Sequence, residues 1–430
     1  MMYALVDING AFVSMEMVFN PGDRFRPAVV LSNGDGCPIA ANRICKDLPG
    51  FELYKPAFMQ EQIMKLYNVL RFSPNFEFYV DMSRRFIEEL RYFSDRVEMY
   101  SIDEAFLDLD FIFICLTEYG HRIRQTILKH LGLPVGIGIA ATKTLCKVAS
   151  RIAKKFIDRT GGVYVIDSEE LRIKALKWLK VGDVWGIANA TVQKLHAIKV
   201  FTAYQFTQLP DSWVLKHMTI VGLRIKQELL GVSCMDITQL VEPKKEIGTA
   251  TQFGEMITDY PLIREATCCK MDYLAGKLRR QNSVASAIKI HLETNSFSML
   301  DEQYYNGTVI TLDVASSDTN YLIKNACIGL DRIFKQGMRY KRVGISLIGL
   351  FPDTCVQQNL FVDTNPKHTV LQKVIDKLNM KYEQGTVRSA SCGYNEDKWK
   401  SKALARTKRY TTRLNEIPII GEDALLKYVS

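Results

Sequence analysis

The sequence predicts an α+β protein made of several domains. The chain has 430 residues and 47% of them are apolar, so it can fill several hydrophobic cores, and a disordered or fibrous protein is excluded. Up to about residue 165, short apolar runs typical of strands alternate with amphipathic stretches typical of helices. Beyond a polar linker at 242–245, strands and helices are predicted in the order βαββαβ. Both parts therefore favour helices packed on a mostly antiparallel sheet.

The first part begins with a short apolar run at 2–8, which we interpret as a central strand that ends in Asp7. The next elements expected are a helix from Ala11, a strand at 27–33, helices near 57–70 and 79–95, a β-hairpin within 97–109, a helix at 116–131, a buried strand at 135–139, a helix at 143–158 and a strand at 162–167. Short helices are then expected at 171–179, 191–198 and 203–209.

The second part is expected to hold a strand at 247–256, a helix at 261–281, strands at 284–294 and 306–313, a helix at 318–336 and a strand at 341–350. A further helix is expected at 367–382. The stretch 398–413 that follows contains seven Lys or Arg residues and no acidic residue.

Composition narrows the class of protein. The formal charge of +9 and the isoelectric point near 8.9 favour a polyanionic partner. The ten cysteines form no C-x-x-C motif and no zinc-like spacing to histidine. With no signal peptide and no apolar run of membrane-spanning length, we expect a cytoplasmic protein with reduced thiols that fill cores, and no membrane partner.

The acidic pair Asp103-Glu104 lies inside the expected hairpin, with apolar residues alternating on both sides. Two adjacent carboxylates raise each other's pKa, and a bound divalent cation removes that cost. For an isolated pair, a turn in solvent is the ordinary explanation. Asp7 supplies a third carboxylate at the end of the first strand, and three such oxygen ligands suit Mg²⁺ if substrate phosphates complete its shell. Two such ions are the usual apparatus of nucleotidyl transfer.

Two motifs carry a family resemblance. The residues Val6-Asp7-Ile8-Asn9, with Phe12 and Glu16, and the run 100–106 resemble the catalytic motifs of Y-family translesion DNA polymerases. The resemblance extends over nearly the whole chain and is strongest to the UmuC branch. It implies error-prone, template-directed DNA synthesis in the SOS response to DNA damage. It also implies catalytic carboxylates at Asp7, Asp103 and Glu104 and two Mg²⁺ ions held by Asp7, Ile8, Asp103 and Glu104.

The resemblance also implies a right-hand architecture with an additional domain. A catalytic palm would comprise 1–19 and 76–167, small fingers 20–75, and a helical thumb 168–241. Within the thumb, Trp185-Gly186-Ile187 resembles a helix-hairpin-helix that binds DNA phosphates. The βαββαβ part at 242–352 would be the little finger, and 353–430 a C-terminal tail. In the little finger, the basic residues expected to contact DNA backbone are Lys277, Arg279, Arg280, Lys289, Arg339, Lys341 and Arg342.

Substrate-binding residues follow from the same resemblance. Phe12 takes the place of the aromatic gate against a ribose 2′-hydroxyl, although a core position is an equally ordinary role. Asn42, Arg43 and Lys46 match the fingers segment that contacts the triphosphate, and Lys154 matches a triphosphate-binding lysine. Lys154 also completes a basic stripe with Lys143, Lys147 and Arg151 on one face of the expected helix 143–158, which on an ordinary helix would be a solvated surface.

The tail resembles partner-binding segments. Gln357-Gln358-Asn359-Leu360-Phe361 resembles a sliding-clamp-binding motif, with Gln357, Leu360 and Phe361 as the contacts. Val374–Asn379 and Arg409–Arg413 resemble the C-terminal module of UmuC-type proteins. The partners expected are therefore primed template DNA and dNTP, the clamp, a processed UmuD dimer and RecA.

Three alternatives remain from the sequence. One is the polymerase IV type of the same family, which lacks the tail module. Another is a nucleotidyl cyclase with a related palm, which would need neither thumb nor little finger. The third is a catalytically idle subunit that binds DNA and clamp, against which the complete carboxylate set argues.

Overall fold

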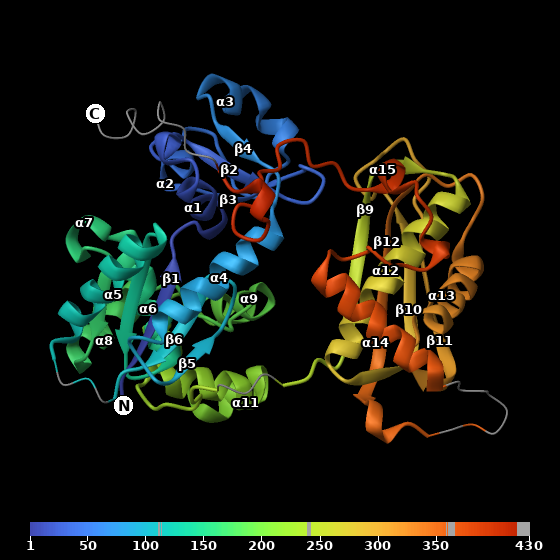
Figure 1. The fold of residues 1–430 in the computed structure, drawn as a ribbon. Helices are drawn as coiled ribbons and strands as arrows, with labels where there is room; N and C mark the ends of the chain where they lie inside the picture. The colour runs from blue at the N-terminus through green and yellow to red at the C-terminus, as the bar shows by residue number, and fades with distance from the viewer. Residues whose placement is uncertain (111, 113, 239–241, 358, 360–365, 419–430) are drawn as a thin grey trace. The chain divides into compact units, whose positions relative to one another are not determined.

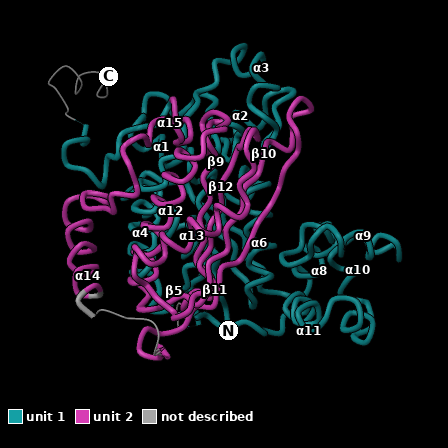
Figure 2. Tube along the Cα trace, turned by 90° about the vertical axis from the view of Figure 1, so that its right-hand side faces the viewer, with its two compact units in different colours: residues 1–32, 36–241, 405–430 teal, residues 33–35, 242–404 magenta. Residues whose placement is uncertain are grey.

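The computed structural model describes residues 1–110, 112, 114–238, 242–357, 359 and 366–418. They form two compact units. Unit 1 comprises residues 1–32, 36–241 and 405–430, and unit 2 comprises 33–35 and 242–404 (Figure 2). Segments from early and late in the described sequence therefore belong to unit 1, and each unit is described by itself below.

Unit 1 is built on a five-stranded sheet in the order β5-β6-β1-β7-β8 (Figure 1). All neighbours are antiparallel except β7 and β8. The strands are β1 (Tyr3–Ile8), β5 (Val97–Met99), β6 (Glu104–Asp108), β7 (Val135–Ala140) and β8 (Val163–Ile166). β1 lies between β6 and β7, so it is a central strand, as the sequence predicts, and its apolar run is buried.

Alternation along β1 assigns its side chains to two cores. Ala4, Val6 and Ile8 join the core that includes residues of the helices α1 (Ala11–Val18), α4 (Phe76–Leu90) and α5 (Leu116–Leu131). Tyr3 and Leu5 join the core on the other face, with α6 (Lys143–Lys155). Asp7 has the same parity as Tyr3 and Leu5, so it lies on the α6 face of the sheet.

A glycine of β7 determines how closely α6 approaches the sheet. A Cβ atom on Gly138 would lie only 2.1 Å from the backbone nitrogen of Ser150 on α6. No larger residue fits there, so α6 packs directly on β7. The side chains that α6 presents at the end of β1 are therefore held at a fixed register against the strand.

The segment 20–75 forms a smaller three-stranded sheet, ordered β3-β2-β4. The expected strand at 27–33 is β2 (Ala28–Leu31), but the sequence did not reveal its neighbours β3 (Pro38–Ala41) and β4 (Leu70–Phe72). The expected helix at 57–70 is shorter: a 3-10 turn, η2 (Ala57–Gln60), leads into α3 (Glu61–Leu66). It ends there because Asn68 adopts a left-handed conformation with φ of 47°, and the chain then pairs with β2. The short helix α2 (Arg43–Lys46) follows β3.

Helices fill the remainder of unit 1 to residue 238. The observed helices are α7 (Ile157–Thr160), α8 (Glu169–Trp178), α9 (Asn189–Ala197), α10 (Ala203–Thr207) and α11 (Asp211–Leu229). Three of them match expected helices, but α11 was not expected. A non-helical Thr219, with φ of 64°, interrupts α11 and weakens its sequence pattern.

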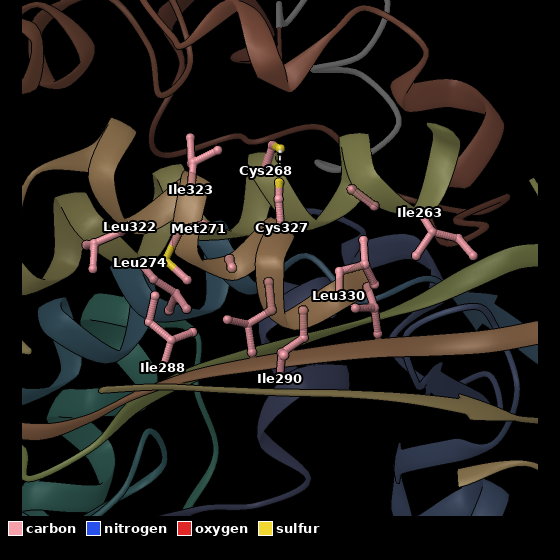
Figure 3. Packing of buried hydrophobic residues seen from close by; sticks show 14 of the residues in the cluster. Ile263, Cys268, Met271, Leu274, Ile288, Ile290, Leu322, Ile323, Cys327 and Leu330 are labelled. Atoms are coloured by element: carbon pink, nitrogen blue, oxygen red, sulfur yellow. Dashed lines mark hydrogen bonds between the residues drawn. The ribbon is translucent and has the colours of Figure 1, made fainter. Parts of the chain in front are cut away.

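Unit 2 contains the predicted βαββαβ arrangement as an antiparallel sheet ordered β11-β10-β12-β9. Its elements are β9 (Ile247–Ile257), α12 (Tyr260–Arg280), β10 (Ser283–Thr294), β11 (Tyr305–Ser316), α13 (Thr319–Ile333) and β12 (Tyr340–Pro352). Ile288 and Ile290 of β10 point toward residues of the two helices, such as Met271 and Leu330 (Figure 3). The thiols of Cys268 and Cys327 lie 3.7 Å apart in this core, and all ten cysteines are free.

The C-terminal part of the chain is divided between the units. The helix α14 (Pro366–Lys381) and the short α15 (Glu396–Trp399) belong to unit 2, where Trp399 is buried and donates to Glu265 at 3.1 Å. From residue 405 onward the chain belongs to unit 1. Within the described residues, no helix has the length and apolar character needed to cross a membrane.

Candidate active site

The three predicted carboxylates meet where β1 ends and β6 begins. Asp7 and Glu104 are direct cross-strand partners, which places their Cβ atoms roughly 5 Å apart. The backbone N–H of Ile8 donates to the carbonyl of Asp103 at 2.9 Å, so Asp103 continues the pairing by one residue. Two segments that are distant in sequence therefore present Asp7, Asp103 and Glu104 at one end of the sheet.

Lys154 of α6 forms an ion pair with Asp7, in keeping with the parity of Asp7 along β1. Gly136 of β7 makes room for it, since a Cβ atom there would lie 2.9 Å from Cγ of Lys154. The pKa of Asp7 is raised to about 7: burial is the main cause, Lys154 opposes the rise, and the carboxylates of Glu104 and Asp103 add to it. Asp7 thus lies in a place where a nearby positive charge is required.

Each of the other two carboxylates also has a partner. Glu104 accepts from Lys147 at 2.9 Å, and the Lys147 ammonium lies 4.2 Å from the ring centre of Tyr100. Asp103 accepts from the hydroxyl of Ser101 at 2.6 Å.

The basic stripe of α6 is not a solvated surface. Lys143 is buried and pairs with Glu98 at 2.6 Å, and Arg151 pairs with Asp183 at 2.7 Å. Together with Lys147 and Lys154, every basic residue of the stripe has an acidic partner. Two of the four, Lys147 and Lys154, therefore balance the charge of the predicted catalytic carboxylates Glu104 and Asp7. Lys147 is a site residue that we did not single out from the sequence, although the stripe contains it.

These pairings affect metal binding. Among the described residues, no three His, Cys, Asp or Glu side chains form a group with the geometry of a metal site. The carboxylate oxygens are directed instead to two lysines and a serine. The donor set nevertheless suits a hard divalent cation, because it consists of carboxylate oxygens that repel one another when unpaired.

A cavity of about 510 Å³ adjoins Lys154 within unit 1. Four of the predicted substrate-binding residues line it, namely Asn42, Arg43, Lys46 and Lys154, and Phe12 does not. Asn9 also lines the cavity, and its side-chain oxygen is buried without a hydrogen-bond partner within the described residues. A buried polar atom of this kind marks a place where a ligand or water completes the structure.

The three predicted fingers residues differ in whether their side chains are available to bind an anion. Asn42 caps α2, and its amide is engaged by the backbone of Arg26, Ala28 and Cys45, so it shapes the loop. Arg43 has only long ion pairs, of 3.8 and 3.9 Å, with two exposed carboxylates. Lys46 is exposed and has no ion pair within the described part of the chain. Among the predicted fingers residues, Arg43 and Lys46 are therefore the cations best placed to meet an anion in this cavity.

Phe12 is partly buried at the start of α1. Its ring stacks on Tyr79 with a centroid distance of 4.8 Å and meets the edge of Phe76 at 5.8 Å. Tyr79 is fully buried on α4 and had no distinguishing signal in the sequence.

Two other sets of predicted residues need comment. In unit 2, Arg279 is not available for DNA, because it binds Asp376 through two nitrogens at 2.6 and 2.7 Å and is nearly buried. Of the predicted clamp contacts, Gln357 is exposed, whereas Leu360 and Phe361 lie outside the described residues.

Comparisons with known proteins decide the family. The chain matches the impB/mucB/samB family over residues 6–151 and the C-terminal domain of that family over 244–360. It is 37% identical to protein UmuC of Salmonella typhimurium over 97% of this chain and 99% of that protein. The chain belongs to the UmuC branch of the Y-family translesion DNA polymerases. A DNA polymerase IV of Clostridium acetobutylicum is 25% identical over 91% of the chain and 98% of that protein, so the UmuC branch is favoured over the polymerase IV type.

The fold agrees with this family. A Y-family DNA polymerase chimera, Dbh-Dpo4(243-245)-Dbh, superposes with a TM-score of 0.65 at 20% identity, covering 82% of this chain and 100% of that one. The insertion ternary complex of Dbh DNA polymerase gives 0.54, with the same identity and coverage. The UmuC-family chain thus has the palm, fingers, thumb and little finger architecture, while our residue boundaries for these parts stay a prediction. Residues 370–420 match a domain of unknown function, DUF4113.

Proposed function

We propose that this UmuC-family polymerase extends primed DNA at the end of the β1–β6 pair, with Asp7, the backbone of Ile8, Asp103 and Glu104 holding two Mg²⁺ ions. The observation that carries the proposal is the register of Asp7 opposite Glu104, next to a cavity lined by cationic residues. When bound, the two ions supply the positive charge that in-line nucleotidyl transfer needs. The raised pKa of Asp7 supports a cation there, since burial and two neighbouring carboxylates cause the rise.

The cationic residues of the cavity would bind the triphosphate of the incoming nucleotide. Arg43 and Lys46 have no strong competing partner, so their charge is available to phosphate oxygens. Lys154 lies between Asp7 and the cavity that it lines, so it can serve a carboxylate in the free enzyme and a phosphate in the complex. There it would offset charge that develops on the leaving pyrophosphate.

Phe12 would exclude ribonucleotides from this site. Its ring is held by Tyr79 and Phe76, so it cannot rotate away without losing two aromatic contacts. A fixed ring beside the C2′ position rejects a 2′-hydroxyl by steric conflict.

The test is single-nucleotide primer extension by the full chain with Mg²⁺. Pyrophosphate should be released only when both a primed template and the complementary dNTP are present. Release from a nucleoside triphosphate without primed template would instead support the cyclase alternative, and no release under any condition would support an idle DNA-binding subunit. Adding a processed UmuD dimer and RecA tests whether these partners are needed.

We also propose that Gln357, Leu360 and Phe361 bind the sliding clamp, and that the protein acts in the cytoplasm, on the nucleoid, during the SOS response. Two buried apolar side chains contribute roughly 1.5–3 kcal/mol each, so replacing Leu360 and Phe361 by Ala should weaken clamp binding at least about a hundredfold. Extension without clamp should survive. Unchanged clamp affinity in the double variant would refute this assignment.

A further inference from the structure

The last described segment of the chain packs on unit 1 beside the predicted nucleotide site. The hydroxyl of Ser73 accepts from the N–H of Ala405 at 2.9 Å, and the carbonyl of Ala405 accepts from the N–H of Ser73 at 3.0 Å. Asn75, which is buried at the start of α4, donates its amide to the carbonyls of Thr407 and Lys408 at 3.2 Å. The backbone of 405–408 is therefore fixed along the entrance to α4.

Aromatic and charged contacts hold the next residues of this segment. Tyr410 stacks on Phe19 with a centroid distance of 4.6 Å and meets the edge of Phe78 at 6.0 Å. Arg409 forms an ion pair with Glu77 at 3.6 Å. We call residues 405–413 the docking segment. They lie inside the match to a domain of unknown function at 370–420.

The docking segment reaches the ring of Phe12 through two intermediates. Glu16 lies four residues after Phe12 on α1, so both side chains face α4. The same oxygen of Glu16 accepts from the hydroxyl of Tyr79 at 2.6 Å and from the hydroxyl of Thr407 at 3.2 Å. The ring of Tyr79 in turn stacks on the ring of Phe12, at an interplanar angle of 16°.

Glu16 is an unusual residue to find in this position. Its side chain is completely buried, it has no ion pair within the described residues, and its second carboxylate oxygen has no hydrogen-bond partner. Among the residues that the structure describes, its donors are the hydroxyls of Tyr79 and Thr407. Since a buried carboxylate with few donors is costly, removing one hydroxyl should shift the group and the tyrosine bound to it.

We propose that the docking segment positions the sugar gate, with Thr407, Glu16 and Tyr79 as positioning residues that fix the ring of Phe12. This inference rests on the proposed role of Phe12. It assigns to the C-terminal segment a part in sugar selection, through contacts in unit 1 and without contact to the nucleotide.

The experiment compares four variants of the full chain in single-nucleotide extension with dNTP and with the matching ribonucleotide. In Thr407→Val the hydroxyl is lost at nearly constant volume, and the ratio of ribonucleotide to dNTP kcat/KM should rise about fivefold, the effect of one typical hydrogen bond. Thr407→Ser keeps the hydroxyl and should restore the ratio. Thr412→Val is the matched control: Thr412 lies in the same segment and donates to Glu77 at 3.0 Å, with no contact to Glu16. Its ratio should stay that of the wild type.

The fourth variant, Phe12→Ala, separates the two proposals. It should raise the ratio much further, on the order of a hundredfold. If Phe12→Ala leaves the ratio unchanged, Phe12 is no gate and the proposed site is wrong. If Phe12→Ala raises the ratio but Thr407→Val does not, the gate stands and the positioning role is refuted. A lower melting temperature of Thr407→Val with an unchanged ratio would likewise refute it, because that is the result of a purely structural contact.

Discussion

Two buried carboxylates at the start of the chain are held in opposite ways. Asp7 is paired with the long, flexible Lys154, and Glu104 beside it with Lys147. Within the described part of the chain, Glu16 is bound by the hydroxyls of Tyr79 and Thr407 and by no cation. The pKa of both Asp7 and Glu16 is raised to about 7, chiefly by burial, but only at Asp7 do neighbouring carboxylates add to the rise.

This comparison separates the site proposed to react from the site proposed to position a neighbouring ring. A lysine can leave a carboxylate when another cation arrives, because its flexible side chain lets the ammonium group move. The hydroxyls at Glu16 are short and belong to residues fixed by packing, so that carboxylate can keep neighbouring groups in place but cannot exchange partners. Each of the following predictions tests this distinction.

The largest effect is expected at the reactive carboxylates. Asp103→Ala or Glu104→Ala should lower the rate of nucleotide incorporation by several decades and leave DNA affinity nearly unchanged, because charge stabilisation and metal binding are lost together. Glu98→Ala is the control, since Glu98 pairs with Lys143 of the same stripe away from the predicted metal positions. Activity within about tenfold of the wild type in single-turnover extension would remove Asp103 or Glu104 from the catalytic role.

A smaller effect is expected on stability from Glu16. Burial raises the pKa of Glu16 from 4.5 to about 7, while the hydrogen bonds from Tyr79 and Thr407 oppose the rise. Between these pH values the folded chain keeps a proton that the unfolded chain has lost, so the free energy of unfolding falls as pH rises, by about 3 kcal/mol in all. The other titratable groups facing this pair are Tyr410 and, near Tyr79, Arg406.

Glu16→Gln should remove this dependence. Denaturant unfolding of the variant and the wild type at pH 5 and pH 8 provides the measurement, and the difference between the two chains cancels the contribution of every other titrating group. The variant should gain stability relative to the wild type at pH 8. A difference that does not change with pH would mean that Glu16 is ionised in the folded protein throughout this range.

The smallest of these effects is expected from replacing Lys154. Lys154→Met should raise the KM for dNTP about tenfold, because one phosphate contact is lost. Lys155→Met is the matched control, because the ammonium of Lys155 lies over the ring of Trp178 and Lys155 does not line the cavity. An equal KM for the two variants would show that Lys154 serves Asp7 alone.

The sequence predicted those parts of the fold that have long or strongly apolar patterns. The strands β1 and β7 and the elements of unit 2 fall within a few residues of their expected positions. The short β4 was missed because its three residues carry almost no pattern, and the left-handed Asn68 before it cannot be read from composition. The helix α11 was missed because Thr219 interrupts it.

For the site, the motifs were enough to single out the three carboxylates. The register of Asp7 opposite Glu104 is visible only in the structure. The same holds for the acidic partner of each basic residue on α6. The docking segment was beyond prediction. It appeared in the sequence only as part of a basic stretch, yet its contacts to Glu16 and Asn75 are made by Thr407, and its ring contact by Tyr410. Short polar side chains more than three hundred positions away from their partners leave no periodic signal in a sequence.

Unit 1 is made from both ends of the chain, with unit 2 inserted between them. On the ribosome, the strands that carry Asp7, Asp103 and Glu104 emerge early and can pair while the rest is still being synthesised. Of the two hydroxyls bound to Glu16, that of Thr407 is available only after translation has passed residue 407. A chain cut by a protease or truncated by a stop codon just before the docking segment would keep the three predicted catalytic carboxylates. It would lose the contacts that this segment makes with α1 and α4. The contacts of the docking segment with α1 and α4 therefore form only in a chain that has been synthesised past this segment.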